Sequence, residues 1–115
     1  MEKMSTAFPD LAVGIIDSLT AENRRDLVEQ LKASVIDRVT FDDLANAGYI
    51  YVHQSRPLNV VEQNVIGRHR GETIAVDCGY GVNLDVDNVG RLSGIEVLNP
   101  GNLKAELRKR AQNEE

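Results

Sequence analysis

The stretch Val82–Leu98, V-N-L-D-V-D-N-V-G-R-L-S-G-I-E-V-L, decides the fold. In its first half apolar and polar residues alternate, which is the period of a strand with one buried face. Residues 88–90 break this pattern, and apolar residues return from Leu92 onward. The stretch therefore predicts two antiparallel strands joined by a tight turn.

The register of this hairpin depends on the length of its loop. A three-residue loop at Asn88–Gly90 places its glycine in the left-handed conformation that closes a type I turn with a bulge. Val86 then faces Leu92 and Asp87 faces Arg91, so that like pairs with like and opposite charges meet. A two-residue loop would set Val86 against Arg91. We therefore favour the three-residue loop.

The same register fixes which side chains share a face. It places Glu96 with Val82 and Leu84, on an apolar face where a carboxylate needs a partner. Ile95 and Val97 then project to the opposite face, which makes the second strand apolar on both sides. An apolar second face is typical of a sheet completed by another chain. The sequence thus predicts a homodimer or a small protein partner.

Composition limits the class of protein. The chain of 115 residues has the length of one domain, and no apolar run approaches the ~20 residues that span a membrane. The first residues lack the apolar stretch of a secretory signal and Cys78 is the single cysteine, so we expect a cytoplasmic protein. The net charge of −5 argues against nucleic acid as a partner, because phosphate neutralisation supplies most non-specific affinity.

The spacing of apolar residues predicts the other elements. Residues 1–7 are expected to be a loose end, and helices are expected over 9–19 and 21–34, with Thr20 as the N-cap of the second. Further strands are predicted over 36–41, 49–53, 59–66 and 73–77. Residues 99–101 end the sheet, and Asn102 is expected to cap a helix over 103–110.

Together these elements predict a single α+β domain over residues 1–115. Residues 1–35 form a helical pair that packs on one face of an antiparallel β-meander of five or six strands, built from residues 36–98. Residues 99–115 form a short C-terminal helix and tail.

Two segments carry a family resemblance. Phe41-Asp42 precedes Asn46-Ala47-Gly48-Tyr49-Ile50, and Leu84–Leu98 reads L-D-V-D-N-V-G-R-L-S-G-I-E-V-L. Both resemble signatures of the bacterial domain-of-unknown-function family 2283, although the helical pair before Ile36 is extra and the region Val60–Gly81 is longer. The resemblance implies a compact antiparallel sheet without an established activity. Some members of that family lie beside genes resembling ribonuclease-type toxins, which implies an antitoxin-like or partner-binding role.

The hairpin also matches part of a calcium-binding loop. Asp85, Asp87, Gly90 and Glu96 occupy positions 1, 3, 6 and 12 of that template. Position 5 is Val89, which has no ligand oxygen, and the flanks are strands rather than helices. We favour a turn stabilised by acidic residues, and we expect no metal and no cofactor.

Glu96 on an apolar face has two interpretations. It could be a general acid or base with a raised pKa, acting with Asp85 and a histidine. The alternative, which we favour, is a carboxylate paired with an arginine or lysine of a helix or a second subunit. Arg91 is expected to be engaged by Asp87 across the turn.

Arg68, His69 and Arg70 form a basic loop between two glycines. Glycines let a backbone approach a phosphate, which two arginines can grip. The same composition is found at exposed hairpin tips, and we favour that reading.

Tyr49, Tyr51 and His53 share one face of a predicted strand. This pattern resembles a base-stacking platform. Since no lysine or arginine interleaves with them, we favour a face that packs against the helical pair.

We expect a small non-enzymatic protein–protein interaction module, of which an antitoxin is one form. One alternative is a small enzyme or ligand-binding protein that uses Glu96 and Asp85, and another is weak RNA contact through Arg68 and Arg70. No membrane contact is expected. The predicted binding residues are Asp85, Asp87, Arg91, Glu96, Arg68, His69 and Arg70.

Overall fold

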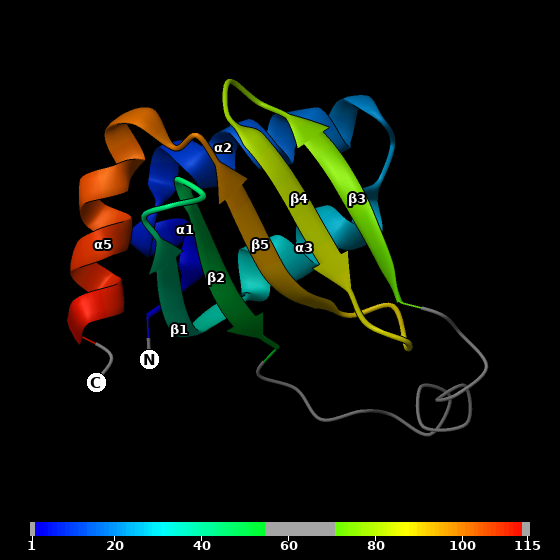
Figure 1. The fold of residues 1–115 in the computed structure, drawn as a ribbon. Helices are drawn as coiled ribbons and strands as arrows, with labels where there is room; N and C mark the ends of the chain where they lie inside the picture. The colour runs from blue at the N-terminus through cyan, green and yellow to red at the C-terminus, as the bar shows by residue number, and fades with distance from the viewer. Residues whose placement is uncertain (1, 55–70, 114–115) are drawn as a thin grey trace.

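The computed structural model describes residues 2–54 and 71–113, and it consists of one sheet with helices on one side (Figure 1). The strands are β1 (Val35–Asp42), β2 (Ala47–His53), β3 (Glu72–Asp77), β4 (Gly81–Val86) and β5 (Leu92–Leu98). The helices are α1 (Met4–Ala7), α2 (Pro9–Ala21), α3 (Arg25–Ala33), the 3-10 turn η1 (Gly101–Leu103) and α5 (Lys104–Asn113). The predicted α+β class is confirmed. The strand predicted over residues 59–66 lies outside the described residues.

The strands are all antiparallel and lie in the order β1-β2-β5-β4-β3. This order departs from the predicted meander, because β5 lies between β2 and β4 instead of at an edge. Its core-facing residues Ile95 and Val97 are fully buried. A central position hides both backbone edges of the strand, and it places these apolar side chains at the middle of the core.

The N-terminal residues are part of the fold, so the predicted loose end is wrong. Lys3 forms an isolated bridge with Val35, and the Met4 N–H donates to the Ser34 carbonyl at 3.0 Å. Met4, in α1, is fully buried. A buried methionine this close to the terminus fixes the start of the chain against β1.

The break between α2 and α3 lies later than predicted. Thr20 is inside α2, where its hydroxyl donates to the Ile16 carbonyl at 2.7 Å, so it is not the N-cap of the next helix. The chain turns at Asn23, whose φ of 61° is a left-handed conformation that asparagine tolerates. The backbone N–H of Arg24 closes this turn by donating a hydrogen bond to the Leu19 carbonyl at 2.8 Å. Leu11, Ile15 and Leu19 of α2 are buried, as are Leu27 and Leu31 of α3.

The turn of the β4–β5 hairpin agrees with the prediction. Gly90 has a φ of 81°, and the Asp87 N–H donates to the Arg91 carbonyl at 2.8 Å across the loop. Val86 pairs with Leu92, as the three-residue loop requires.

The register beyond Leu92 differs from the prediction. A bulge leaves Ser93 without a partner on β4, so that Asp85 pairs with Gly94 and Leu84 pairs with Ile95. One extra residue inverts every later side chain, because strands alternate with a period of two. Glu96 therefore does not share the apolar face, and Ile95 and Val97 do not project away from it. The prediction was wrong at all three positions, and the two-sided apolar strand that suggested a homodimer does not exist.

Helices α1, α2 and α3 lie behind the sheet in Figure 1, and they bury the core on that face. The buried strand residues of this core are Ile36, Val39, Ile50, Val52, Val76, Val82, Leu84, Val86, Leu92, Ile95 and Val97. Among the described residues no helix covers the opposite face, which we call the open face. No helix of the described ranges is long and apolar enough to cross a membrane.

Helix α5 packs beside β1 and β2 (Figure 1). Leu107 is fully buried there, and a Cβ added at Gly48 would lie 2.8 Å from its Cδ1 atom. Glycine at this position lets the helix approach the sheet. Asn102 is not the cap predicted for this helix, since it lies within η1 and its side-chain oxygen accepts the Tyr80 hydroxyl at 2.7 Å.

Candidate functional site

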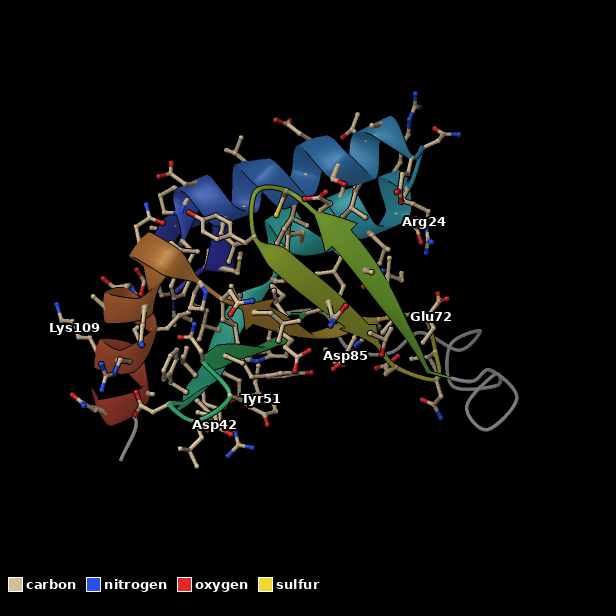
Figure 2. All side chains as sticks on the ribbon, turned by 45° about the horizontal axis from the view of Figure 1, so that its top comes forward. Arg24, Asp42, Tyr51, Glu72, Asp85 and Lys109 are labelled. Atoms are coloured by element: carbon tan, nitrogen blue, oxygen red, sulfur yellow. The ribbon has the colours of Figure 1, made fainter. Side chains whose placement is uncertain are left out.

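The open face carries the tyrosines of β2. Ile50 and Val52 alternate with Tyr49 and Tyr51, and the two aliphatic residues are the buried ones. The expectation that the tyrosines pack against the helices was therefore wrong. In Figure 2, Tyr51 lies on the side of the sheet away from α2.

Tyr49 reaches across the sheet to Asp85. Its ring lies over Gly94, where an added Cβ would overlap the ring, and its hydroxyl donates to Asp85 Oδ2. The Thr73 hydroxyl donates to Asp85 Oδ1 at 2.9 Å. Both carboxylate oxygens thus accept a hydrogen bond, and the network links β2, β4 and β3 above the glycine of β5. Asp85 is held in place by its neighbours, which suits a structural anion better than a proton carrier.

The environment of Tyr49 raises the pKa of its hydroxyl well above the usual value. Burial is the largest cause, followed by the hydrogen bond to Asp85 and by the negative charges of Asp85 and Glu96. All of them favour the neutral phenol, which alone can donate to the carboxylate.

This pKa shift predicts a loss of stability in alkali. Above pH about 10 an unfolded tyrosine releases its proton, whereas folded Tyr49 retains it, so the unfolded state gains stability relative to the folded state. We expect the free energy of unfolding to fall as pH rises from about 10, and to fall less in Tyr49→Phe. Urea unfolding of both proteins across that range measures the difference. Parallel curves would contradict the assignment.

Arg38 and Tyr51 extend the row of side chains to the edge of the sheet. The Arg38 guanidinium carbon lies 4.2 Å from the centre of the Tyr51 ring, which is a cation–π contact. The ring centres of Tyr51 and Tyr49 are 4.5 Å apart at 49°. An arginine therefore does accompany the tyrosines, from the neighbouring strand β1, which sequence periodicity within β2 could not indicate.

A hollow of about 240 Å³ opens on this face at the β1–β2 turn. Asp42, Tyr49 and Glu96 lie among its lining residues. Glu96 is half-buried, and its Oε1 accepts the Asn83 amide at 2.9 Å. Two carboxylates beside an aromatic ring suit a cationic group such as a lysine or arginine side chain. Leu44, at the tip of the same turn, is 100% exposed.

Among the described strand residues, the open face carries a negative charge. Alternation within the observed register places one arginine, Arg38, on this face. The same alternation places four carboxylates there, which are Asp42, Asp77, Asp85 and Glu96. The face therefore attracts cations and repels phosphates.

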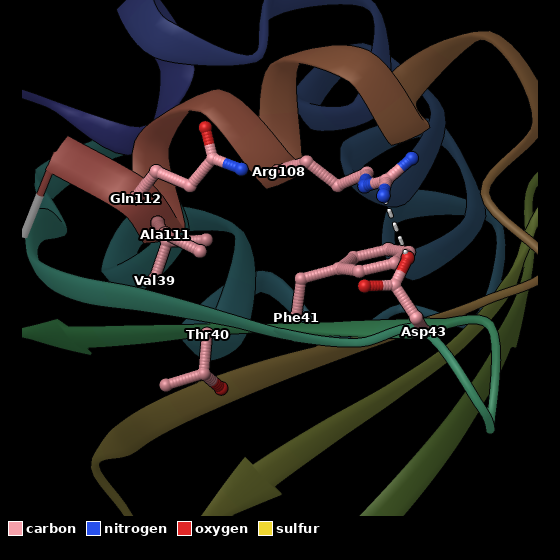
Figure 3. Close-up of a pocket in the computed structure, with 7 residues that line it drawn as sticks. All are labelled: Val39, Thr40, Phe41, Asp43, Arg108, Ala111 and Gln112. Atoms are coloured by element: carbon pink, nitrogen blue, oxygen red, sulfur yellow. Dashed lines mark ion pairs between the residues drawn. The ribbon is translucent and has the colours of Figure 1, made fainter.

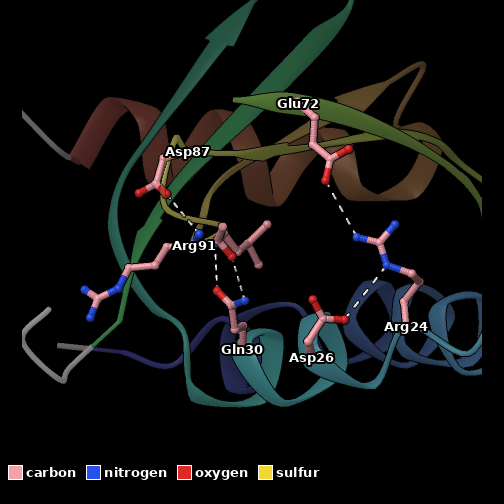
Figure 4. Close-up of polar contacts among 8 residues, drawn as sticks. Arg24, Asp26, Gln30, Glu72, Asp87 and Arg91 are labelled. Atoms are coloured by element: carbon pink, nitrogen blue, oxygen red, sulfur yellow. Dashed lines mark hydrogen bonds and ion pairs between the residues drawn. The ribbon is translucent and has the colours of Figure 1, made fainter. Parts of the chain in front are cut away.

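The predicted site residues fall into three groups. Asp85 and Glu96 share the open face on the adjacent strands β4 and β5. Asp87 and Arg91 lie apart from them, at the hairpin turn beside α3, where Asp87 Oδ1 accepts the Arg91 N–H at 2.9 Å (Figure 4). The third group, residues 68–70, lies outside the described residues. Within the ranges that the structure describes, no group of three or more histidine, cysteine, aspartate or glutamate side chains could hold a metal ion.

Gln30 of α3 fastens the hairpin turn to the helices. Its amide nitrogen donates to the Gly90 carbonyl at 2.9 Å, and its amide oxygen accepts the Leu92 N–H at 2.8 Å (Figure 4). No sequence pattern indicates this contact, because residue 30 and the turn are distant along the chain.

Loss of this side chain is expected to weaken the fold. Gln30→Ala leaves two half-buried backbone groups without their partner, which should lower the free energy of unfolding by about 1–2 kcal/mol. Gln30→Glu keeps the acceptor but loses the donor, so an intermediate loss is expected. Urea unfolding measures both, with Glu29→Ala on the exposed side of α3 as control. Equal stability of Gln30→Ala and the control would contradict the role of this contact.

Comparison with protein-family models, curated proteins and solved structures found no match for this chain. The resemblance to family 2283 therefore stays a prediction.

Proposed function

We propose that this protein is a non-enzymatic interaction module that binds a basic protein through its open face. The observation that carries the proposal is the hollow at the β1–β2 turn, where Asp42 and Glu96 flank Tyr49. A lysine or arginine of the partner would enter this hollow, and Leu44 would contact apolar surface at its rim. Aromatic rings with low rotational freedom are typical anchors of protein interfaces.

The charge of the open face supports a basic protein over other partners. Within residues 2–54 and 71–113, four carboxylates against one arginine disfavour the phosphate backbone of RNA, although tyrosine rings also stack on bases. Two copies of the chain meeting face to face would bring like charges together, which costs affinity. A small basic protein also agrees with the antitoxin-like role that the family resemblance implies.

The hydrogen bonding of Asp85 supports binding over catalysis. Its two oxygens accept from Tyr49 and Thr73, so both are already engaged within the protein. A general acid or base needs an oxygen that can reach substrate.

The test begins with the tagged full chain as bait in lysate of its native host, and it continues with the purified partner. Calorimetry then compares the wild type with Glu96→Gln and with Leu44→Ser. The matched controls are Asp17→Asn and Val13→Ser, since both residues are exposed on α2, on the far side of the molecule.

We expect a basic partner whose affinity falls about tenfold in each open-face variant and stays within about twofold in the controls. Added salt should weaken binding. The proposal is wrong if no stoichiometric partner is retained, if the partner is an RNA, or if the open-face variants and controls bind equally.

A further inference from the structure

A second hollow adjoins the first along β1 and lies between this edge strand and helix α5, with Thr40 and Phe41 in the lining of both (Figure 3). Its volume is about 300 Å³. In Figure 3, Phe41 points from β1 toward α5 and Arg108 extends from α5 to Asp43, whereas Thr40 points to the other side of the strand. Lining residues thus come from both faces of β1, and the hollow is a groove along the strand's edge.

The outer edge of β1 is only partly paired. The Ile36 N–H donates to the Glu2 carbonyl at 2.8 Å, and Lys3 bridges Val35. The outer edge of residues 38–42 forms no backbone hydrogen bond with any residue of the described ranges 2–54 and 71–113. Edge N–H and C=O groups are a template for pairing with another extended segment. A short strand therefore fits between the paired end at Val35 and the turn that follows Asp42.

The groove combines apolar side chains with one cation, Arg108. The Phe41 ring is half-buried, and Ala111 lies beside it in the lining. The Lys104 ammonium and the Arg108 guanidinium carbon each lie 5.9 Å from the centre of that ring. Arg108 also forms an ion pair with Asp43 at 3.1 Å. The Arg108 side chain is 48% exposed and that of Asp43 is 62% exposed. Such an exposed pair is weak, so a carboxylate of a ligand can replace Asp43.

We infer that this groove binds an extended acidic peptide segment of a partner protein as an additional strand on β1. The backbone of the segment pairs with Arg38–Asp42, which is the mode known as β-augmentation. An apolar side chain packs on Phe41 and Ala111, and a carboxylate pairs with Arg108. A second copy of this chain is a poorer occupant, because edge-to-edge pairing would bring two basic α5 helices together.

The test uses fluorescence anisotropy with the full chain and two labelled probes. One probe is a short peptide of alternating valine and glutamate, and the other alternates valine and lysine. Arg108→Glu removes the cation of the groove. Lys109→Glu is the matched control, since it makes the same charge change one residue along, at an exposed position that points away from the molecule in Figure 2.

We expect the acidic peptide to bind at least about tenfold more tightly than the basic one. Arg108→Glu should weaken acidic-peptide binding about tenfold, and Lys109→Glu by less than about threefold. Hydrogen exchange should show new protection of the amides of Arg38–Asp42 when the acidic peptide is bound.

Three results would overturn the inference. They are no binding of the acidic peptide at about 1 mM, equal weakening by the two variants, and protection of another region. Self-association of the free protein through Arg38–Asp42, seen by light scattering and hydrogen exchange, would assign the groove to a second copy instead. Arg108 lines this groove and does not line the hollow of the open face, so the Arg108→Glu result is separate from the test of the proposed function.

Discussion

Replacing Ile95 with lysine is expected to lower the free energy of unfolding by about 4 kcal/mol or more. Ile95 is fully buried at the centre of the sheet, between Ile50 on β2 and Leu84 on β4. The substitution loses its apolar burial and places an ammonium group where the core supplies aliphatic neighbours. Urea unfolding followed by circular dichroism measures the loss, and a protein that is unfolded without urea meets the prediction.

The neighbouring substitution makes this a test of the strand register. Glu96→Lys lies on the open face, so its free energy of unfolding should stay within about 1 kcal/mol of the wild type. In the register without a bulge the two positions exchange roles, and Glu96 becomes the buried one. A tolerated Ile95→Lys together with a damaging Glu96→Lys would therefore rule out the bulge at Ser93.

The bulge explains why the sequence predicted the hairpin but not its faces. Alternation identified both strands and the glycine turn, because these depend on neighbours along the chain. An extra residue at Ser93 leaves the composition of β5 unchanged, yet it moves Glu96 from one face to the other. Its Oγ donates to the Asp85 carbonyl at 3.1 Å, a contact that exists only after the strands have paired. A single sequence carries no direct sign of it.

The open face was predictable in part. Ile50 and Val52 are more apolar than Tyr49 and Tyr51, so the alternation within β2 already favoured the aliphatic side as the core. The prediction that the tyrosines face the helices was wrong because it considered basic residues only within β2 itself. Arg38 stands opposite Tyr51 on β1, and only the pairing of β1 with β2 brings them together.

The groove beside β1 was beyond sequence reasoning. The terminal helix was predicted, and its apolar Leu107 marks the side that faces the sheet. Its position over Phe41 depends on Gly48, which has no side chain to obstruct Leu107. The position of α5 beside β1 also depends on the strand order. In the observed order β5 pairs with β2, so the helix that follows β5 lies near β1.

Gly94→Ala is expected to destabilise the protein although alanine is the smallest possible addition. Gly94 is buried under the Tyr49 ring, and a methyl group there would overlap that ring. The ring must move, which breaks its hydrogen bond to Asp85. Losing this hydrogen bond and the packing of the ring should cost more free energy than is gained by restricting the unfolded chain with alanine. We expect a net decrease of about 2 kcal/mol in the free energy of unfolding.

A double mutant isolates the cause. In a Tyr49→Ala background no ring lies over residue 94, so adding Gly94→Ala should cost little or should stabilise by about 0.5 kcal/mol through the unfolded chain. The coupling energy between the two positions is then about 2 kcal/mol. If Gly94→Ala is equally damaging in both backgrounds, the glycine is needed for the backbone of β5 and not for the ring. In that case the Tyr49–Asp85 contact, and with it the shape of the open face, would not depend on Gly94.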